Sequence, residues 1–365
     1  MNTITQRTID LAIEIQQIPA PTFDEGDRAA FLRDRFKAEG LIDVEMDALG
    51  NVFAYLPGEG SAKPVIVSAH SDTVFPKHIN LNVKRVPNEI HGPGIGDNSL
   101  GAAGLFSVLW MLKAQDITLP GDLWLVANIG EEGLGDLKGM RAIVDRFGDG
   151  PLAYIVLEGL SLGQIFHRAL GVQRYRISAH TKGGHSWANY GTPSAVQELA
   201  SLVCKFTTLK LSRIPRTTLN VGIFTGGTSV NTIAAEASLE LDLRSEEPQA
   251  LKNLILKIEK LVSDTQRPGL HLSTEITGRR PAGEIAVTHP LVKLAIDALA
   301  SQGLKAYLNI GSTDANIPLS RGLPCVCIGL TQGGGAHTPE EFIDTRFLSK
   351  GLAQLITLVR GCYSL

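Results

Sequence analysis

The chain has 365 residues, which is enough for two to three domains of roughly 150 residues each. It carries 34 basic and 37 acidic residues, a formal net charge of −3, and this balance argues against nucleic acid as the main partner because binders of phosphate backbones carry a basic excess. Hydrophobic residues make up 44% of the chain and charged residues 19%, which excludes a disordered tail or a coiled coil and indicates a large core.

The first residues show no sign of export or of a membrane anchor. Residues 1–17 mix charged with apolar residues and lack the basic-then-apolar order of a secretion signal. No apolar run in the sequence approaches the ~20 residues that cross a bilayer. The 4 cysteines are too few and too scattered for a disulfide framework. We therefore expect a cytoplasmic globular protein without a membrane partner.

Helix and strand patterns alternate in the first and last parts of the chain. Apolar residues recur with helical spacing at 11–18, at 105–112 and again over 345–365. Four short runs are apolar on both faces, which is typical of strands covered by helices on both sides; they are residues 64–69, 123–128, 153–157 and 324–330. This alternation predicts an α/β domain with a mixed sheet between helices.

The middle of the chain has a different pattern. Apolar and polar residues alternate with a period of two over 172–180 and 236–244, as in antiparallel strands with one buried and one wet face. Helical stretches near 193–208 and 247–263 can cover the buried face. We therefore predict an inserted α+β domain at 172–283 and a discontinuous first domain at 1–171 plus 284–365.

Candidate site residues follow the predicted strands in chain order. The first strand runs into His70, and Asp72 can take the proton on the far nitrogen of that ring, as is usual beside a zinc-binding histidine. The glycine-rich segment 92–101 presents Asp97, and its glycines lack the spacing of a nucleotide-binding loop. A helix N-cap formed by Asp97 or Asn98 is the structural alternative.

Further carboxylates and a second histidine follow the other strands. Glu131 and Glu132 come after the second strand, Glu158 ends the third, and His337 lies in the glycine-rich loop after the fourth. Each alone has an ordinary structural explanation, but the strand ends of an open α/β sheet meet at one edge, where ligands bind. Imidazoles with carboxylates suit zinc, cobalt or manganese. Two divalent cations balance three carboxylates and one hydroxide, whereas a single cation leaves the site net negative.

The chain resembles the co-catalytic zinc peptidase and deacylase family of glutamate carboxypeptidase, succinyl-diaminopimelate desuccinylase, acetylornithine deacetylase, aminoacylase and tripeptidase. The resemblance covers almost the whole chain and rests on motifs in the family's order: AHSDTVFP, GPGIGDN, NIGEEG, VLEG, KGGHS, the segment 231–244, GSTDAN and GGGAHTPEE. It implies a zinc-peptidase-like catalytic domain with an inserted lid that usually dimerises, so we expect a homodimer through the lid domain.

The resemblance also implies roles for the site residues. One metal would be held by His70 and Glu158 and the other by Glu132 and His337, with Asp97 bridging the two. Asp72 would support His70, and Glu131 would be the general base that moves a proton from the attacking water to the leaving amine.

Three lid residues match positions that act on the substrate in the family. His185 in KGGHS would support the developing oxyanion, and Asn231 and Arg244 would grip a substrate carboxylate, a task that suits the guanidinium fork. The structural alternative for Arg244 is an exposed charge on an amphipathic strand.

The sequence departs from the family pattern in three places. Pro93 stands where many relatives have arginine, and Asn98 replaces a second aspartate that is not itself a ligand, so we expect metal binding to survive. Glu158 is the residue found in carboxypeptidases and N-deacylases, whereas aminopeptidase members tend to have aspartate.

These features predict a metal-dependent amide hydrolase acting on a small peptide or N-acyl amino acid with a free carboxylate. A tripeptidase-like aminopeptidase is the alternative. A non-catalytic binding protein on the same fold would have lost ligands or the base, and none is missing here.

Overall fold

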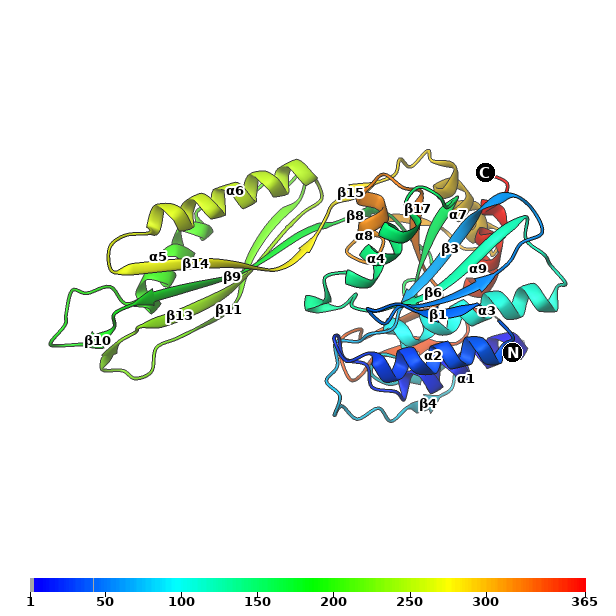
Figure 1. Ribbon diagram of the computed structural model, residues 1–365, viewed down its shortest axis with the longest axis horizontal. Coiled ribbons are helices and arrows are strands. Elements are labelled where there is room, and N and C mark those ends of the chain that lie inside the picture. The colour runs from blue at the N-terminus through cyan, green and yellow to red at the C-terminus, as the bar shows by residue number, and fades with distance from the viewer. Residues whose placement is uncertain (1–2, 42) are drawn as a thin grey trace. The chain divides into compact units, whose positions relative to one another are not determined.

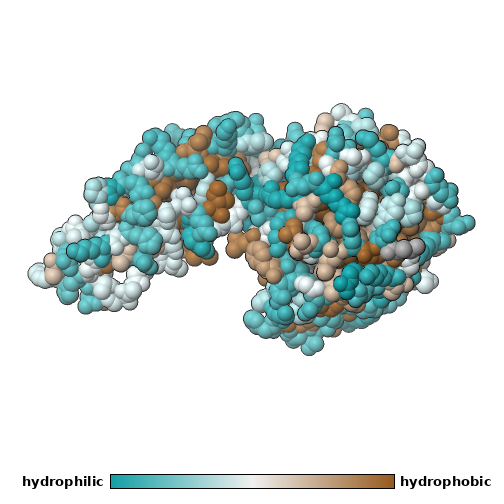
Figure 2. Space-filling model, in the orientation of Figure 1, coloured by the Kyte–Doolittle hydropathy of each residue, from teal (hydrophilic) through white to brown (hydrophobic). Residues whose placement is uncertain are grey.

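The computed structural model describes residues 3–41 and 43–365. Contacts within the chain divide it into two compact units, one formed by residues up to Ala169 together with Glu284–Leu365, and the other by Leu170–Gly283. Each unit has a hydrophobic core of its own. Figure 2 shows hydrophilic residues over most of the visible face of both units. Within the described residues, every helix is too short or too polar to span a bilayer.

The first unit is built on a large mixed sheet with the strand order β1-β2-β6-β3-β7-β17-β8-β15, and β16 pairs with β8 (Figure 1). Strands β3, β6, β7 and β17 run parallel to one another, while β2 and β8 are antiparallel to their neighbours β6 and β17. The strands are β1 (Val44–Met46), β2 (Val52–Leu56), β3 (Ala62–His70), β6 (Gly121–Asn128), β7 (Ala153–Glu158), β8 (Gln164–Ala169), β15 (Gly283–Glu284), β16 (Tyr307–Gly311) and β17 (Cys325–Gly329).

Helices cover both faces of this sheet, since consecutive residues of β3, β7 and β17 are buried. Four helices contact one another in the order α1, α3, α9 and α7. In addition, α4 contacts α8, and α2 packs on β1 and β2. Their bounds are α1 (Thr3–Gln16), α2 (Gly26–Ala38), α3 (Gly101–Ala114), α4 (Lys138–Phe147), α7 (Pro290–Ala300), α8 (Asn316–Ser320) and α9 (Leu348–Cys362). The predicted α/β architecture is confirmed.

A small antiparallel sheet in the same unit joins segments from both ends of the chain. Its order is β18-β19-β5-β4, formed by Gln332–Gly334, Phe342–Asp344, Glu89–His91 and Lys84–Val86. The pairing of β19 with β5 brings the loop after β5 next to the loop between β18 and β19. This sheet was not predicted, because its three-residue strands are too short to show a period.

The second unit is a four-stranded antiparallel sheet in the order β11-β13-β9-β14, with α5 and α6 packed on one face (Figure 1). Tyr175, Ile177, Leu239 and Leu241 alternate along β9 and β13 and are buried beneath these helices. The elements are β9 (Gly171–Thr181), β10 (Gly184–His185), α5 (Ala195–Thr207), β11 (Thr217–Gly226), β12 (Thr232–Ile233), β13 (Glu236–Ser245), α6 (Pro248–Thr265) and β14 (Leu270–Arg280).

Candidate metal centre

The candidate ligands of the first unit meet at one edge of its large sheet. His70 is the last residue of β3 and Glu158 the last residue of β7, while Glu132 follows the end of β6. These three strands are parallel, so their carboxyl ends lie at the same edge. Asp97 comes from the irregular turn η1 (Ile95–Leu100) before α3, and His337 from the loop between β18 and β19.

Asp97 stands between the two histidines. Its Oδ1 lies 3.1 Å from Nε2 of His70, and its Oδ2 lies 3.1 Å from Nε2 of His337. Glu158 Oε2 approaches the same nitrogen of His70 at 3.6 Å, and Glu132 Oε1 approaches that of His337 at 3.3 Å. The five side chains therefore form two triads that share one carboxylate.

Both triads suit a divalent transition metal. In each of them the three donor atoms lie within 4.8 Å of one another, and they are an imidazole nitrogen with two carboxylate oxygens. That donor set fits zinc, cobalt or manganese better than the all-oxygen sites of calcium. Three carboxylates held so close together repel one another unless cations lie between them. The residues present therefore fit two metal ions.

Proton affinities in the centre reflect the same crowding. Burial would lower the pKa of His70, but Asp72, Asp97 and Glu158 outweigh burial and hold that pKa well above its usual range. Hydrogen bonds to Asp97 and Glu132 raise the pKa of His337 to about 10. Burial raises the pKa of Glu158 to about 7. Without metal, protons take the place of cations among these groups.

Asp72 supports the centre in a way that its sequence position does not reveal. Its carboxylate accepts hydrogen bonds from the backbone N–H groups of Glu131 at 3.0 Å and Glu132 at 2.9 Å, and from the hydroxyl of Thr22 at 2.8 Å. Nδ1 of His70 lies closer to the main-chain oxygen of Asp72, at 3.2 Å, than to its carboxylate, at 3.5 Å. Asp72 thus fixes both glutamates as well as the histidine.

Glu131 lies within the same cluster. One of its carboxylate oxygens is within 4.8 Å of ligand atoms of His70 and Glu132, and its side chain is buried. With its backbone N–H held by Asp72, the carboxylate is confined beside the two triads. A carboxylate in this place can exchange a proton with a molecule bound at the centre.

Asn98 is a supporting residue whose role the sequence did not reveal. Its amide donates to the main-chain oxygen of Leu157 at 2.8 Å and accepts from the N–H of Gly159 at 2.9 Å, so it ties both neighbours of Glu158. The N-cap alternative is wrong, since α3 starts at Gly101 and has no side-chain cap. Only the three-dimensional path of the chain brings Asn98 to the end of β7.

The second unit contains the other three predicted site residues. His185 is exposed on β10, and its Nδ1 accepts hydrogen bonds from the N–H groups of Trp187 at 3.1 Å and Ala188 at 3.4 Å. An accepting Nδ1 places the proton of the neutral ring on Nε2, which makes Nε2 the donor of this ring. Asn231 accepts a hydrogen bond from the hydroxyl of Ser229 at 3.0 Å.

Arg244 lies on the open face of β13 and is held by an acid. Its Nε donates to Asp242 at 2.7 Å, and Nε of Arg174 donates to the other oxygen of Asp242 at 3.0 Å. The side chain of Arg244 is 42% exposed, so part of the guanidinium group faces solvent. Asp242 therefore orients the guanidinium group of Arg244 but leaves part of it accessible to solvent.

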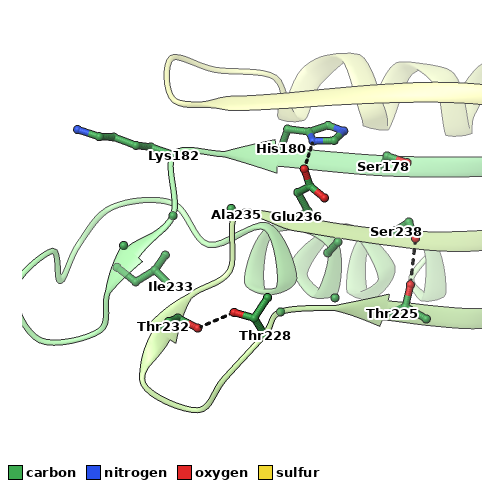
Figure 3. Close-up of a pocket in the computed structure, with 15 residues that line it drawn as sticks. Ser178, His180, Lys182, Thr225, Thr228, Thr232, Ile233, Ala235, Glu236 and Ser238 are labelled. Atoms are coloured by element: carbon green, nitrogen blue, oxygen red, sulfur yellow. Dashed lines mark hydrogen bonds and ion pairs between the residues drawn. The ribbon is translucent and has the colours of Figure 1, made fainter.

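A concavity of about 680 Å³ lies on the same open face, close to the segment that leads into His185 (Figure 3). Its polar side chains pair largely with one another: His180 lies 3.7 Å from Glu236, and the hydroxyls of Thr225 and Ser238 are 3.0 Å apart. Gly183, in the connection from β9 to β10, and Gly184, the first residue of β10, line it. The open face is therefore a wet polar surface.

Residues 66–361 match the sequence profile of Peptidase family M20/M25/M40, which covers most of the chain. The chain belongs to this family. Carboxypeptidase G2 from Pseudomonas sp. (strain RS-16) is 25% identical to this chain over 349 residues, which cover 90% of this chain and 80% of that protein. Family membership makes the chain a metallohydrolase.

Solved structures show the same fold. A tripeptidase from Staphylococcus aureus has a TM-score of 0.84 and 24% identity to this chain, with 99% of each chain covered. A Bacillus subtilis protein described as a dinuclear metal binding peptidase from the M20 family has a TM-score of 0.71 and 17% identity, with 98% of each chain covered. The fold of this chain is therefore that of a catalytic domain with an inserted second domain.

Proposed function

We propose that this protein cleaves an amide bond next to a free carboxylate, as a carboxypeptidase or an N-acyl-amino-acid deacylase. The observation that carries the proposal is the pair of triads sharing Asp97, with Glu131 beside them. Asp97 would contribute one carboxylate oxygen to each of two metal sites, and the adjacent Glu131 would supply the base.

The two triads would hold zinc, with cobalt and manganese as alternatives. When bound, such ions lower the pKa of the attacking water and polarise the scissile carbonyl. Glu131 accepts the proton of that water as the new C–O bond forms. It then passes the proton to the amine nitrogen as the C–N bond breaks, so it ends the reaction as a carboxylate again.

Residues of the second unit would bind the rest of the substrate. Nε2 of the exposed His185 would carry the ring proton and donate it to the oxyanion that develops on the carbonyl. Arg244, oriented by Asp242, and Asn231 would hold the substrate carboxylate. Glu158 in the ligand set also favours a carboxylate-directed activity, because the aminopeptidase members of the family tend to have aspartate there. The substrate is then a small peptide or an N-acyl amino acid.

Matched substrates with one end blocked test this proposal. N-acetylated dipeptides with a free carboxylate should be hydrolysed, and C-terminally amidated dipeptides with a free amine should be hydrolysed far more slowly. Cleavage that requires only the free amine would instead establish the tripeptidase-like aminopeptidase. Metal analysis of purified protein, followed by activity with zinc, cobalt or manganese restored to the metal-free chain, identifies the ion.

We also propose that Leu170–Gly283 acts as a lid and forms a homodimer. Large apolar side chains are exposed in this unit, with Trp187 at 87% and Val230 at 103%. Contact with a second copy would remove them from water. Light scattering of the full chain should give twice the mass of one chain, and a single-chain mass at high concentration would contradict the dimer.

A further inference from the structure

Glu341 is a buried acid that lies where two ligand loops meet. It directly precedes β19, whose residue Phe342 pairs with His91 at the end of β5. The loop after β5 carries Asp97, and the loop before Glu341 carries His337. Glu341 is fully buried, although a carboxylate without partners is costly to remove from water.

The partners of this residue are backbone amides of one loop. Oε1 accepts hydrogen bonds from the N–H groups of Gly96 at 2.6 Å and Asp97 at 2.7 Å, and Oε2 accepts from Gly94 at 3.2 Å. The main-chain oxygen of Glu341 accepts a further bond from the N–H of Gly92 at 2.8 Å. One residue therefore binds four amides within six positions of the chain.

The glycines of this loop make the convergence possible. Gly94 has a φ of +72°, a left-handed conformation that other residues rarely adopt. A Cβ on Gly96 would lie 2.6 Å from the side chain of Leu160. The glycine-rich segment that first suggests a nucleotide loop thus surrounds a carboxylate of the protein itself.

The same residue closes the other loop. Its N–H donates to the main-chain oxygen of Thr338 at 3.2 Å, and the N–H of Thr338 donates to that of Gly335 at 2.9 Å. His337 lies inside this pair of turns. A shift of Glu341 would therefore move the loop that carries His337, while loss of its carboxylate would release the backbone of Asp97.

We propose that Glu341 is a positioning residue that holds Asp97 and His337 at the spacing the two metal ions require. It acts through the backbone of Asp97 and is not itself a ligand, because amide hydrogens occupy its oxygens. The consequence for metal binding rests on the proposed function, whereas the restraint on the loop does not.

The test compares Glu341→Gln with Glu340→Gln, which makes the same change of charge at the exposed neighbouring residue. In Glu341→Gln the amide oxygen still accepts from Gly96 and Asp97, but its NH2 group faces the N–H of Gly94 and cannot accept. Hydrogen exchange of the metal-free proteins should be at least about tenfold faster over residues 92–100 in Glu341→Gln only. Calorimetric titration with zinc should show about tenfold weaker binding in that variant.

Wild-type exchange over 92–100 together with wild-type zinc affinity would overturn the proposal. Exchange that rises equally throughout the chain would overturn it too, since that is general destabilisation. If Glu341→Gln does not fold, Gly94→Ala disturbs the same contact from the other side. It should also accelerate exchange over 92–100 and weaken zinc binding, and unchanged values would count against the role. Exchange in the metal-free chain needs no substrate, so it decides the matter even if no amide is cleaved.

Discussion

His70 and His337 contact opposite oxygens of one carboxylate, each through Nε2 and each at 3.1 Å from Asp97. The two histidines come from a buried strand end and from a loop near the end of the chain. Asp97 therefore links the two triads, so a change at this residue affects both.

Replacing Glu131 by glutamine should separate catalysis from metal binding. The amide cannot accept the proton of the attacking water, so hydrolysis should fall by ~10²–10⁴-fold. Metal content should stay near two ions per chain, because neither shared triad includes Glu131. Turnover and metal analysis on the same preparation check both parts. Retained activity would remove Glu131 from the role of base, and Glu340→Gln is the matched control.

Replacing Asn98 by alanine should weaken the triad that contains Glu158. The change leaves the oxygen of Leu157 and the N–H of Gly159 without their partner, at a cost of about 1–3 kcal/mol for each buried group. Chemical denaturation should report this loss, and zinc titration should show one weakened site of two. Asn82→Ala, at an exposed asparagine, is the control. Two unchanged sites would show that Asn98 does not position Glu158.

Metal affinity should rise with pH between about 7 and 10. Hydrogen bonds to Asp97 and Glu132 raise the pKa of His337 to about 10, so in the metal-free protein this ring is protonated at neutral pH. A metal needs the neutral ring and must displace that proton, so affinity should increase about tenfold per pH unit for each proton released. Chelator competition at several pH values measures the slope. An affinity that is constant from pH 7 to 9 would contradict the assignment of His337 as a ligand.

Replacing His185 by alanine should lower turnover and leave metal content unchanged. Loss of a donor to a developing oxyanion typically costs ~10²–10³-fold in kcat. The fall should appear in kcat more than in KM, because the interaction forms as charge develops. His180→Ala removes another exposed histidine of the same unit and serves as the control. Loss of zinc from His185→Ala would show that His185 supports metal binding, which contradicts its assignment as a donor to the oxyanion.

Replacing Arg244 by alanine should affect only substrates with a free carboxylate. A charge-assisted hydrogen bond contributes about 1.5–3 kcal/mol, which corresponds to roughly 10–100-fold in kcat/KM. Amidated analogues, already poor substrates, should show no further loss. Arg176→Ala removes a guanidinium that is paired with Glu240 on the same face. An equal loss for free and amidated substrates would argue for a structural role.

Much of the candidate site follows from local sequence. His70, Glu132 and Glu158 stand at or just after the ends of apolar runs, and parallel strands necessarily bring such ends to one edge. Asn98 and Glu341 carried no comparable signal. Both are polar residues within loops, and their roles depend on backbone groups of segments far away in the chain.

The sequence by itself determined the layered α/β domain, the inserted antiparallel unit and the residue types able to bind metal, because hydrophobic period and strand ends are local properties of the chain. Only the tertiary structure decided that Asp97 faces both histidines, that Asp72 holds the amides of Glu131 and Glu132, and that Glu341 secures the loop of Asp97. Those relations join segments distant in sequence. The parallel pairing of β3 with β6 brings Asp72 to the two glutamates, while the pairing of β19 with β5, and glycines that allow a close approach, bring Glu341 to the loop of Asp97.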